Sequence, residues 1–153
     1  MARTDYLLKL GVAGVLVSMS GFGCGSAKTA PDLAASSIPQ LRTIGIAYAK
    51  ATTELDRPPQ NKEELMLYLK DLAKGYDNPA DVLRSKVDDE DFVIHYGVDF
   101  REVTGKDTDM PVLAYEKHGK DGKRAVLLYR FPYLKTDEDF ANCKFPPGYK
   151  SPL

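Results

Sequence analysis

The sequence predicts an α+β fold in which N-terminal amphipathic helices pack on a small antiparallel sheet. Up to about residue 75 the apolar residues recur at helical spacing, whereas from residue 91 onward they alternate as they do in strands. Between two apolar runs, residues 117–123 contain Gly119 and the pair Asp121-Gly122, which suit a tight β-hairpin connection. Because a short hairpin joins antiparallel neighbours, we expect an antiparallel sheet.

The first helix is expected from residue 38 to about residue 55. Ser36 or Ser37 can cap its N-terminus, and Pro39 is tolerated in the first turn because its missing N–H would have no partner there. Gly45 leaves room beside the helix for the close approach of another element. One apolar stripe recurs at helical spacing and consists of Leu41, Ile44, Tyr48, Ala51 and Leu55.

A second helix is expected after Pro58 and Pro59, which cannot continue the first one. Asn61 followed by Glu64 is typical of a capped helix start, and Gly75 lies where the helix should end. Its apolar stripe consists of Leu65, Tyr68, Leu69 and Leu72. A short helical turn is expected to open at residues 78–79 and to run to residue 83.

Three strands are expected, at residues 91–96, 112–116 and 124–129. In the first, Phe92, Ile94 and Tyr96 should lie on one face, with Val93 and His95 on the other. Residues 131–133 extend the sheet in this interpretation. Residues 137–141 form one helical turn, and residues 145–149 close the chain as an extended tail.

The first 24 residues have the pattern of an export signal that ends on a cysteine. Arg3 and Lys9 provide a short basic start, residues 10–22 are an apolar run of about a dozen residues, and Gly23 precedes Cys24. The run is short for a membrane span, which needs about 20 apolar residues. The pattern therefore places the rest of the chain on the far side of the inner membrane.

Gly23 and Cys24 resemble the lipobox of bacterial lipoproteins, in which the cysteine is acylated and becomes the new N-terminus. Gly21 and Phe22 depart from that pattern, since the family usually has leucine and a small residue at these two places. The resemblance implies lipidation at Cys24 and a membrane partner through the lipid anchor. A secretory signal cleaved near Ala27 and an uncleaved anchor are the alternatives.

This leader predicts three parts. Residues 1–23 are a signal peptide, residues 24–37 are the lipidated cysteine with a flexible tether rich in small residues, and residues 38–153 are a single α+β domain. The predicted location is the cell envelope, with the domain anchored to the membrane and facing the periplasm or the exterior.

The composition gives no sign of a nucleic-acid partner. A net charge of -1 and 28% charged residues exclude a basic nucleic-acid-binding surface.

The order of elements resembles the soluble part of pilin-like secretion proteins, the major pseudopilins and prepilin-like envelope proteins. The residues that carry this resemblance are the run from Leu41 to Tyr48, the proline break at Pro58 and Pro59, and the strand that follows Gly122. The resemblance implies a helix packed on a small sheet. Pilins polymerise through a long hydrophobic N-terminal helix that this chain replaces with a leader and a tether, so the expected domain is not competent for filament assembly.

Residues for catalysis are sparse. His95 falls in a strand and His118 in a turn, without a second histidine at metal-ligand spacing, so structural roles are expected for both. Cys143 is a free thiol in the lipidated protein, because Cys24 is then acylated. The pattern predicts no catalytic residue and no cofactor.

Three acidic loops are candidate calcium sites. Asp107 and Asp109 are weak candidates, because carboxylates at alternate loop positions can face one ion. Two other acidic clusters, at residues 88–91 and 137–139, lack the spacing and central glycine of an EF-hand loop. Solvated loop charges explain all three clusters more simply.

The resulting hypothesis is an exported, lipid-anchored envelope protein with a binding or structural role and a possible envelope protein partner. One alternative is a periplasmic thiol-dependent hydrolase or redox accessory that uses Cys143. Another is a small-ligand or glycan-binding module that uses the exposed faces of Tyr129, Tyr133 or Tyr149.

Overall fold

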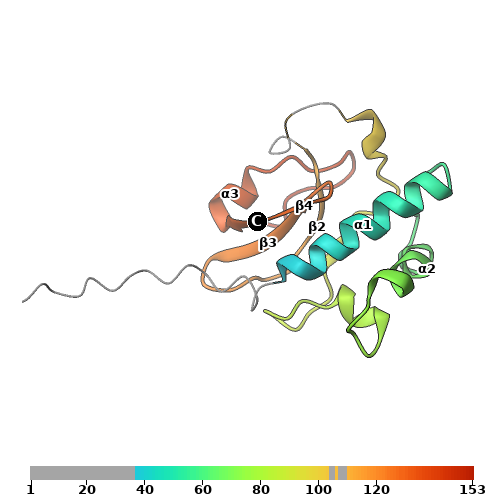
Figure 1. The fold of residues 1–153 in the computed structure, drawn as a ribbon. Coiled ribbons are helices and arrows are strands. Elements are labelled where there is room, and N and C mark those ends of the chain that lie inside the picture. Colours follow the sequence, from blue (N-terminus) through green and yellow to red (C-terminus); the bar gives the residue numbers. More distant parts are fainter. Residues whose placement is uncertain (1–36, 104–105, 107–109) are drawn as a thin grey trace, which may run out of the picture. The chain divides into compact units, whose positions relative to one another are not determined.

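The computed structural model describes residues 37–103, 106 and 110–153, and these form helices and one antiparallel sheet (Figure 1). This confirms the predicted α+β class. Cys24 and the rest of the predicted leader and tether up to residue 36 lie outside the described residues. The elements in chain order are α1 (Ile38–Glu54), α2 (Lys62–Leu72), η1 (Pro79–Leu83), β1 (Val93–Ile94), η2 (Phe100–Glu102), β2 (Val112–Tyr115), β3 (Lys123–Leu128), β4 (Phe131–Thr136) and α3 (Asp137–Ala141).

Helix α1 lies against the sheet with the apolar stripe that its spacing predicted. Leu41, Ile44 and Tyr48 are buried, and Leu55, just past the helix end, is exposed. Gly45 lies close to the sheet, since an added Cβ there would lie 3.0 Å from the Cα of Arg130 in the β3–β4 turn and 3.3 Å from Cδ1 of Leu127. The expected close approach at this glycine is therefore confirmed.

The predicted role of Ser37 as a side-chain cap is wrong. Ser37 occupies the N-cap position of α1, but its hydroxyl makes no capping hydrogen bond. It is fully buried and bonds the hydroxyl of Ser85 over 3.0 Å. A buried hydroxyl takes the partner that the tertiary structure brings to it, and here that partner comes from the loop after η1.

Helix α2 begins as its sequence predicted. The side chain of Asn61 accepts a hydrogen bond from the backbone N–H of Glu64 over 2.9 Å. The carboxylate of Glu64 in turn bonds the backbone N–H of Gln60 and the guanidinium of Arg57. Leu65 and Leu69 are buried against α1, and the short η1 follows as predicted. No helix in the described part of the chain is long and apolar enough to cross a membrane.

The sheet has the strand order β1-β2-β3-β4, and every neighbouring pair is antiparallel. Alternate residues of β3 belong to two separate hydrophobic clusters. Ala125 and Leu127 face the cluster beneath α1 and α2, whereas Val126 and Leu128 face a second cluster on the opposite side. Strand β3 is therefore buried on both faces, which explains its continuous apolar run.

The connection between β2 and β3 is the hairpin that the sequence predicted. Lys120 pairs with Lys123, so Asp121 and Gly122 are the two central residues of the turn. Both have positive φ, 53° and 68°. Such a turn matches the right-handed twist of the strands, which is why an Asp-Gly pair favours it.

Strand β1 is shorter than predicted, because the ladder ends soon after Ile94. The backbone N–H of His95 still bonds the carbonyl of Leu113, but that of Gly97 bonds the carbonyl of Pro59. The expected division of faces holds. The even-numbered residues of this segment pack against the first cluster, and Val93 packs against the second.

The second face of the sheet is covered by the C-terminal part of the chain. Phe140 of α3 is fully buried there against Tyr115, at a ring-centroid distance of 4.9 Å, and Phe145 packs beside it. The sequence predicted residues 145–149 as an extended tail, and the structure shows that Phe145 of this tail packs on the sheet. The face of β3 that carries Val126 and Leu128 is apolar and must be shielded from water. Helix α3 and Phe145 pack on this face and bury it.

Arg124 is the charged residue most deeply placed in this second layer. Its side chain is 4% exposed, its Nη2 lies 2.8 Å from Oδ1 of Asp137, and its guanidinium lies 4.5 Å from the ring centroid of Phe140. Its Nη1 also donates to the carbonyl of Lys117. The guanidinium thus ties α3 to the β2–β3 hairpin.

We expect Arg124→Ala to lower the free energy of unfolding by about 3 kcal/mol, because it removes a buried charge with its hydrogen bonds and leaves a gap over Phe140. Asp137→Asn is the matched change on the half-exposed partner and should cost about 1 kcal/mol or less. Urea unfolding of the two variants checks this. Equal losses of unfolding free energy in the two variants would contradict the burial of Arg124.

Candidate functional site

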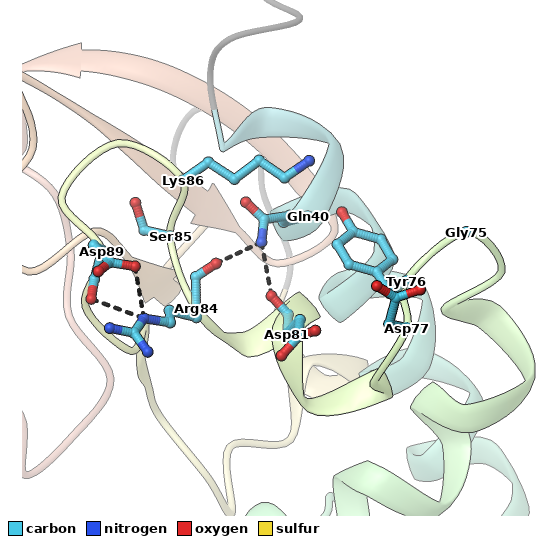
Figure 2. A pocket seen from close by; sticks show the side chains of 9 residues that line it. All are labelled: Gln40, Gly75, Tyr76, Asp77, Asp81, Arg84, Ser85, Lys86 and Asp89. Carbon is cyan, nitrogen blue, oxygen red and sulfur yellow. Dashed lines mark hydrogen bonds and ion pairs between the residues drawn. The ribbon is translucent and has the colours of Figure 1, made fainter.

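The described residues contain a polar hollow of about 460 Å³ between the start of α1 and the loops around η1 (Figure 2). We call it the Gln40 hollow. It is lined by Gln40, Gly75, Tyr76, Asp77, Asp81, Arg84, Ser85, Lys86 and Asp89. These residues come from α1 and from residues 75–89, which are distant in sequence, so packing of α1 against η1 assembles the site.

Gln40 is the buried polar residue of this hollow, with 1% of its surface exposed. Its Nε2 donates to the carbonyl of Asp81 over 3.0 Å and to the carbonyl of Arg84 (Figure 2). Because both partners are carbonyl oxygens, the amide nitrogen must face them. Its Oε1 is buried and has no hydrogen-bond partner among the described residues. An unsatisfied buried acceptor costs about 1–3 kcal/mol, so a donor that reached this oxygen would relieve that cost.

Charged side chains of both signs line the hollow. Nε of Arg84 lies 2.8 Å from Oδ1 of Asp89, which partly neutralises one side of the hollow. On the other side the ammonium group of Lys86 lies 5.4 Å from the ring centroid of Tyr76. Partial burial raises the pKa of the Tyr76 hydroxyl, so the hydroxyl stays protonated and able to donate. The site therefore offers donors at its rim and a buried acceptor within.

A buried hydrogen-bond chain supports the floor of the hollow at Ser85. The hydroxyl of Ser85 donates to Oε1 of Glu116 over 3.0 Å and therefore accepts from the hydroxyl of Ser37. The other carboxylate oxygen of Glu116 accepts from the backbone N–H of Ala125 over 2.6 Å. Glu116 is 1% exposed, and these bonds hold the loop after η1 against the sheet.

A second hollow, of about 430 Å³, lies where the C-terminal segment crosses the end of β1. Its lining includes Tyr96 and Tyr149 together with Pro146 and Pro147. The hydroxyl of Tyr149 donates to the carbonyl of Tyr96 over 3.4 Å. Its other lining residues are Gly97, Val98, Asp99, Val103 and Pro111.

His95 lies beneath Tyr149 with 2% of its surface exposed, and the two ring centroids are 4.0 Å apart. The rings of Tyr115 and Phe145 lie at 5.8 and 6.0 Å. Neither ring nitrogen has a hydrogen-bond partner among the described residues. Burial lowers the pKa of His95 to about 4, because the charged imidazolium would be desolvated there. The structural role predicted for this histidine agrees with its position, although its nitrogens are unsatisfied.

Cys143, the residue of the thiol alternative, and His118 have different surroundings. The thiol of Cys143 donates to the carbonyl of Asp139 over 3.4 Å, and the side chain packs against the second cluster. Burial raises the pKa of Cys143, which disfavours the thiolate that nucleophilic chemistry requires. His118 is exposed in the hairpin, where its backbone N–H bonds the carboxylate of Asp88.

The calcium candidates Asp107 and Asp109 lie outside the described residues. In the described cluster at residues 88–91, each acidic side chain has a partner in the protein. Asp88 accepts from the backbone of the β2–β3 hairpin, while the other three pair with basic side chains: Asp89 with Arg84, Glu90 with Lys117 and Asp91 with Lys62. The described part of the chain contains no group of three or more His, Cys, Asp or Glu residues placed to hold a metal ion.

The three tyrosines proposed for glycan stacking lie apart from the Gln40 hollow. Tyr129 stacks on Phe100 at 5.1 Å, and Tyr133 is partly buried against the second cluster. Tyr149 is 42% exposed, and its ring lies against His95. Tyr76, which the sequence analysis did not single out, is the tyrosine that lines the Gln40 hollow.

Sequence reasoning missed the residues of this site, and one signal pointed to them. Gln40 precedes Ile44 by four positions and therefore lies on the buried stripe of α1, where a polar residue requires an explanation. Glu116 likewise continues the buried run of β2. Lys86 and Tyr76 carry no such signal, because only the chain path brings them to Gln40.

Comparison of the chain with protein-family models, with curated proteins and with solved structures found no match.

Proposed function

We propose that the protein is an exported, lipid-anchored protein of the bacterial cell envelope, and that its domain binds a ligand rather than catalysing a reaction. Anchoring is supported by the sequence of the leader, in which Gly23 and Cys24 follow a basic start and an apolar run. The pilin-like resemblance stays a prediction within this proposal, with a domain that does not assemble into filaments.

The single structural observation that supports a binding role is the buried, unpartnered Oε1 of Gln40. Its side chain is held rigidly, because the amide nitrogen bonds two backbone carbonyls. The hollow around it has the size of a small-molecule site and is lined mostly by polar side chains. A preorganised acceptor in a space of this kind favours recognition of a ligand with a hydrogen-bond donor.

The alternative of a thiol-dependent hydrolase or redox accessory requires an activated Cys143. Such cysteines have a lowered pKa and lie beside a base or a positive charge. In this chain burial raises the pKa of Cys143, and its thiol bonds a backbone carbonyl. These two observations favour the binding role over thiol chemistry.

Expression in a bacterium with lipoprotein processing tests the anchor. We expect the wild-type protein to enter the detergent phase with added acyl mass, and Cys24→Ser to lose both properties, because acylation takes place on the thiol of that cysteine. Cys143→Ser is the matched control and should keep the acyl mass. The measurements are detergent phase partition and intact mass. An unacylated wild-type protein in the aqueous phase would overturn the anchoring proposal.

A further inference from the structure

We propose that the Gln40 hollow binds a ligand through a secondary amide, whose N–H donates to Oε1 of Gln40 and whose carbonyl accepts from the rim. This rests on the proposed binding role and names the chemistry of the ligand. A secondary amide occurs both in peptides and in acetamido sugars, and the two sources share this recognition.

The first requirement is a donor that can approach a buried oxygen. Oε1 of Gln40 cannot be satisfied by rotating its own amide, because Nε2 is held by the carbonyls of Asp81 and Arg84. A charged ammonium would lose much of its hydration on reaching this oxygen, and the loss is far larger for an ion than for a neutral N–H. The buried acceptor therefore favours a neutral donor.

The second requirement is an acceptor on the same ligand. Lys86 extends along the hollow past Gln40, and the hydroxyl end of Tyr76 lies on the same side (Figure 2). Lys86 is exposed, and among the described residues its ammonium contacts the ring of Tyr76 in a cation–π arrangement, so it can turn to a ligand carbonyl. A trans amide presents its N–H and its carbonyl in opposite directions, which fits an acceptor within the site and donors at its rim.

The experiment uses the purified full chain in detergent micelles and follows the side-chain NH₂ signal of Gln40 by NMR. The probes are trialanine and N-acetylglucosamine, with alanine and glucose as matched molecules that lack the amide. We expect a saturable shift with at least one amide probe and none with alanine or glucose. A response to trialanine alone identifies a peptide ligand, and a response to N-acetylglucosamine alone identifies an acetamido sugar.

Two lysine variants test the rim. Lys86→Met should weaken binding of the responding probe at least fivefold, because the ammonium is lost from an exposed position that the fold does not need. Lys135→Met is the control, since Lys135 lies 5.9 Å from the ring centroid of Tyr133, outside the hollow. Equal weakening by both variants would contradict the assigned role of Lys86.

If alanine or glucose shifted the Gln40 signal as much as the amide probes do, recognition through an amide would be contradicted. A zwitterion or a hydroxyl ligand would then be favoured. No shift with any of the four probes would also contradict recognition through an amide. Neither result bears on acylation of Cys24, so failure of this inference is distinguishable from failure of the envelope anchor.

Discussion

Gly119→Ala is expected to lower the free energy of unfolding by about 3 kcal/mol, a large fraction of the stability of a small domain. An added Cβ at this position would lie 2.3 Å from the backbone oxygen of Lys123 and 2.8 Å from Cβ of Arg124. The φ of Gly119 is also positive, 71°, which other L-residues adopt at a cost of about 1–2 kcal/mol. The hairpin would have to open to relieve the contact, and the bond from the Gly119 N–H to Asp88 would weaken.

Gly122→Ala is the matched control in the same hairpin. Its φ is 68°, but an added Cβ there would meet nothing within 4 Å. Both substitutions carry the same cost of positive φ and the same change in the unfolded chain, so their difference isolates the contact with Lys123. We expect Gly122→Ala to cost about 1 kcal/mol. Thermal or urea unfolding measures both variants, and equal losses would show that the hairpin does not have the described geometry.

Protonation of His95 is expected to destabilise the fold as the pH falls from about 6.5 toward 4. Burial lowers the pKa of this histidine from 6.5 to about 4. In that interval the unfolded chain binds a proton at His95 that the folded chain does not, so stability is fully present above pH 6.5 and declines below it. At 1.36 kcal/mol per unit of pKa, the loss reaches about 3 kcal/mol.

The side chains around His95 explain why its protonation destabilises the fold. The rings of Tyr115, Phe145 and Tyr149 surround it, and a charged imidazolium would find no carboxylate among these contacts. Loss of the tilted ring contact with His95, at a centroid distance of 4.0 Å, would release Tyr149 and with it the C-terminal segment. We therefore expect acid to loosen this end of the chain before the helices.

Urea unfolding at a series of pH values checks this prediction. In His95→Phe the decline between pH 6.5 and 4 should largely disappear, because phenylalanine keeps an aromatic ring and binds no proton. The control is His118→Gln, which removes the exposed histidine of the hairpin and should leave the wild-type pH dependence intact. An NMR titration that placed the pKa of His95 near 6.5 would contradict the prediction.

Local patterns account for the parts of the fold that the sequence predicted. The stripe of α1, the cap of α2 at Asn61 and the turn at Asp121 and Gly122 each depend on residues a few positions apart. Helical spacing, capping and turn chemistry act over this range, so they can be read without knowledge of the fold. The α+β class follows from them.

The candidate site was not predictable in the same way, because its contacts join distant parts of the chain. The bond from Gln40 to Asp81 spans 41 residues, and the bond between Ser37 and Ser85 spans 48. A hydroxyl that could cap a helix instead bonds a partner that packing brings to it. Similarly, His95 is a strand residue in the sequence, and only the C-terminal segment that covers it makes it a buried base.

The sequence by itself therefore determined the helices, the strands in their order along the chain and the hairpin, whereas the export pattern that ends at Cys24 stays a prediction. The tertiary structure alone decided which polar groups lose contact with water: Gln40, Glu116, Arg124 and His95 are all at most 3% exposed. The physical reason is that secondary structure depends on neighbours along the chain, whereas burial depends on which surfaces pack together. Binding chemistry arises from burial, because a polar group without water must find its partner within the protein or in a ligand.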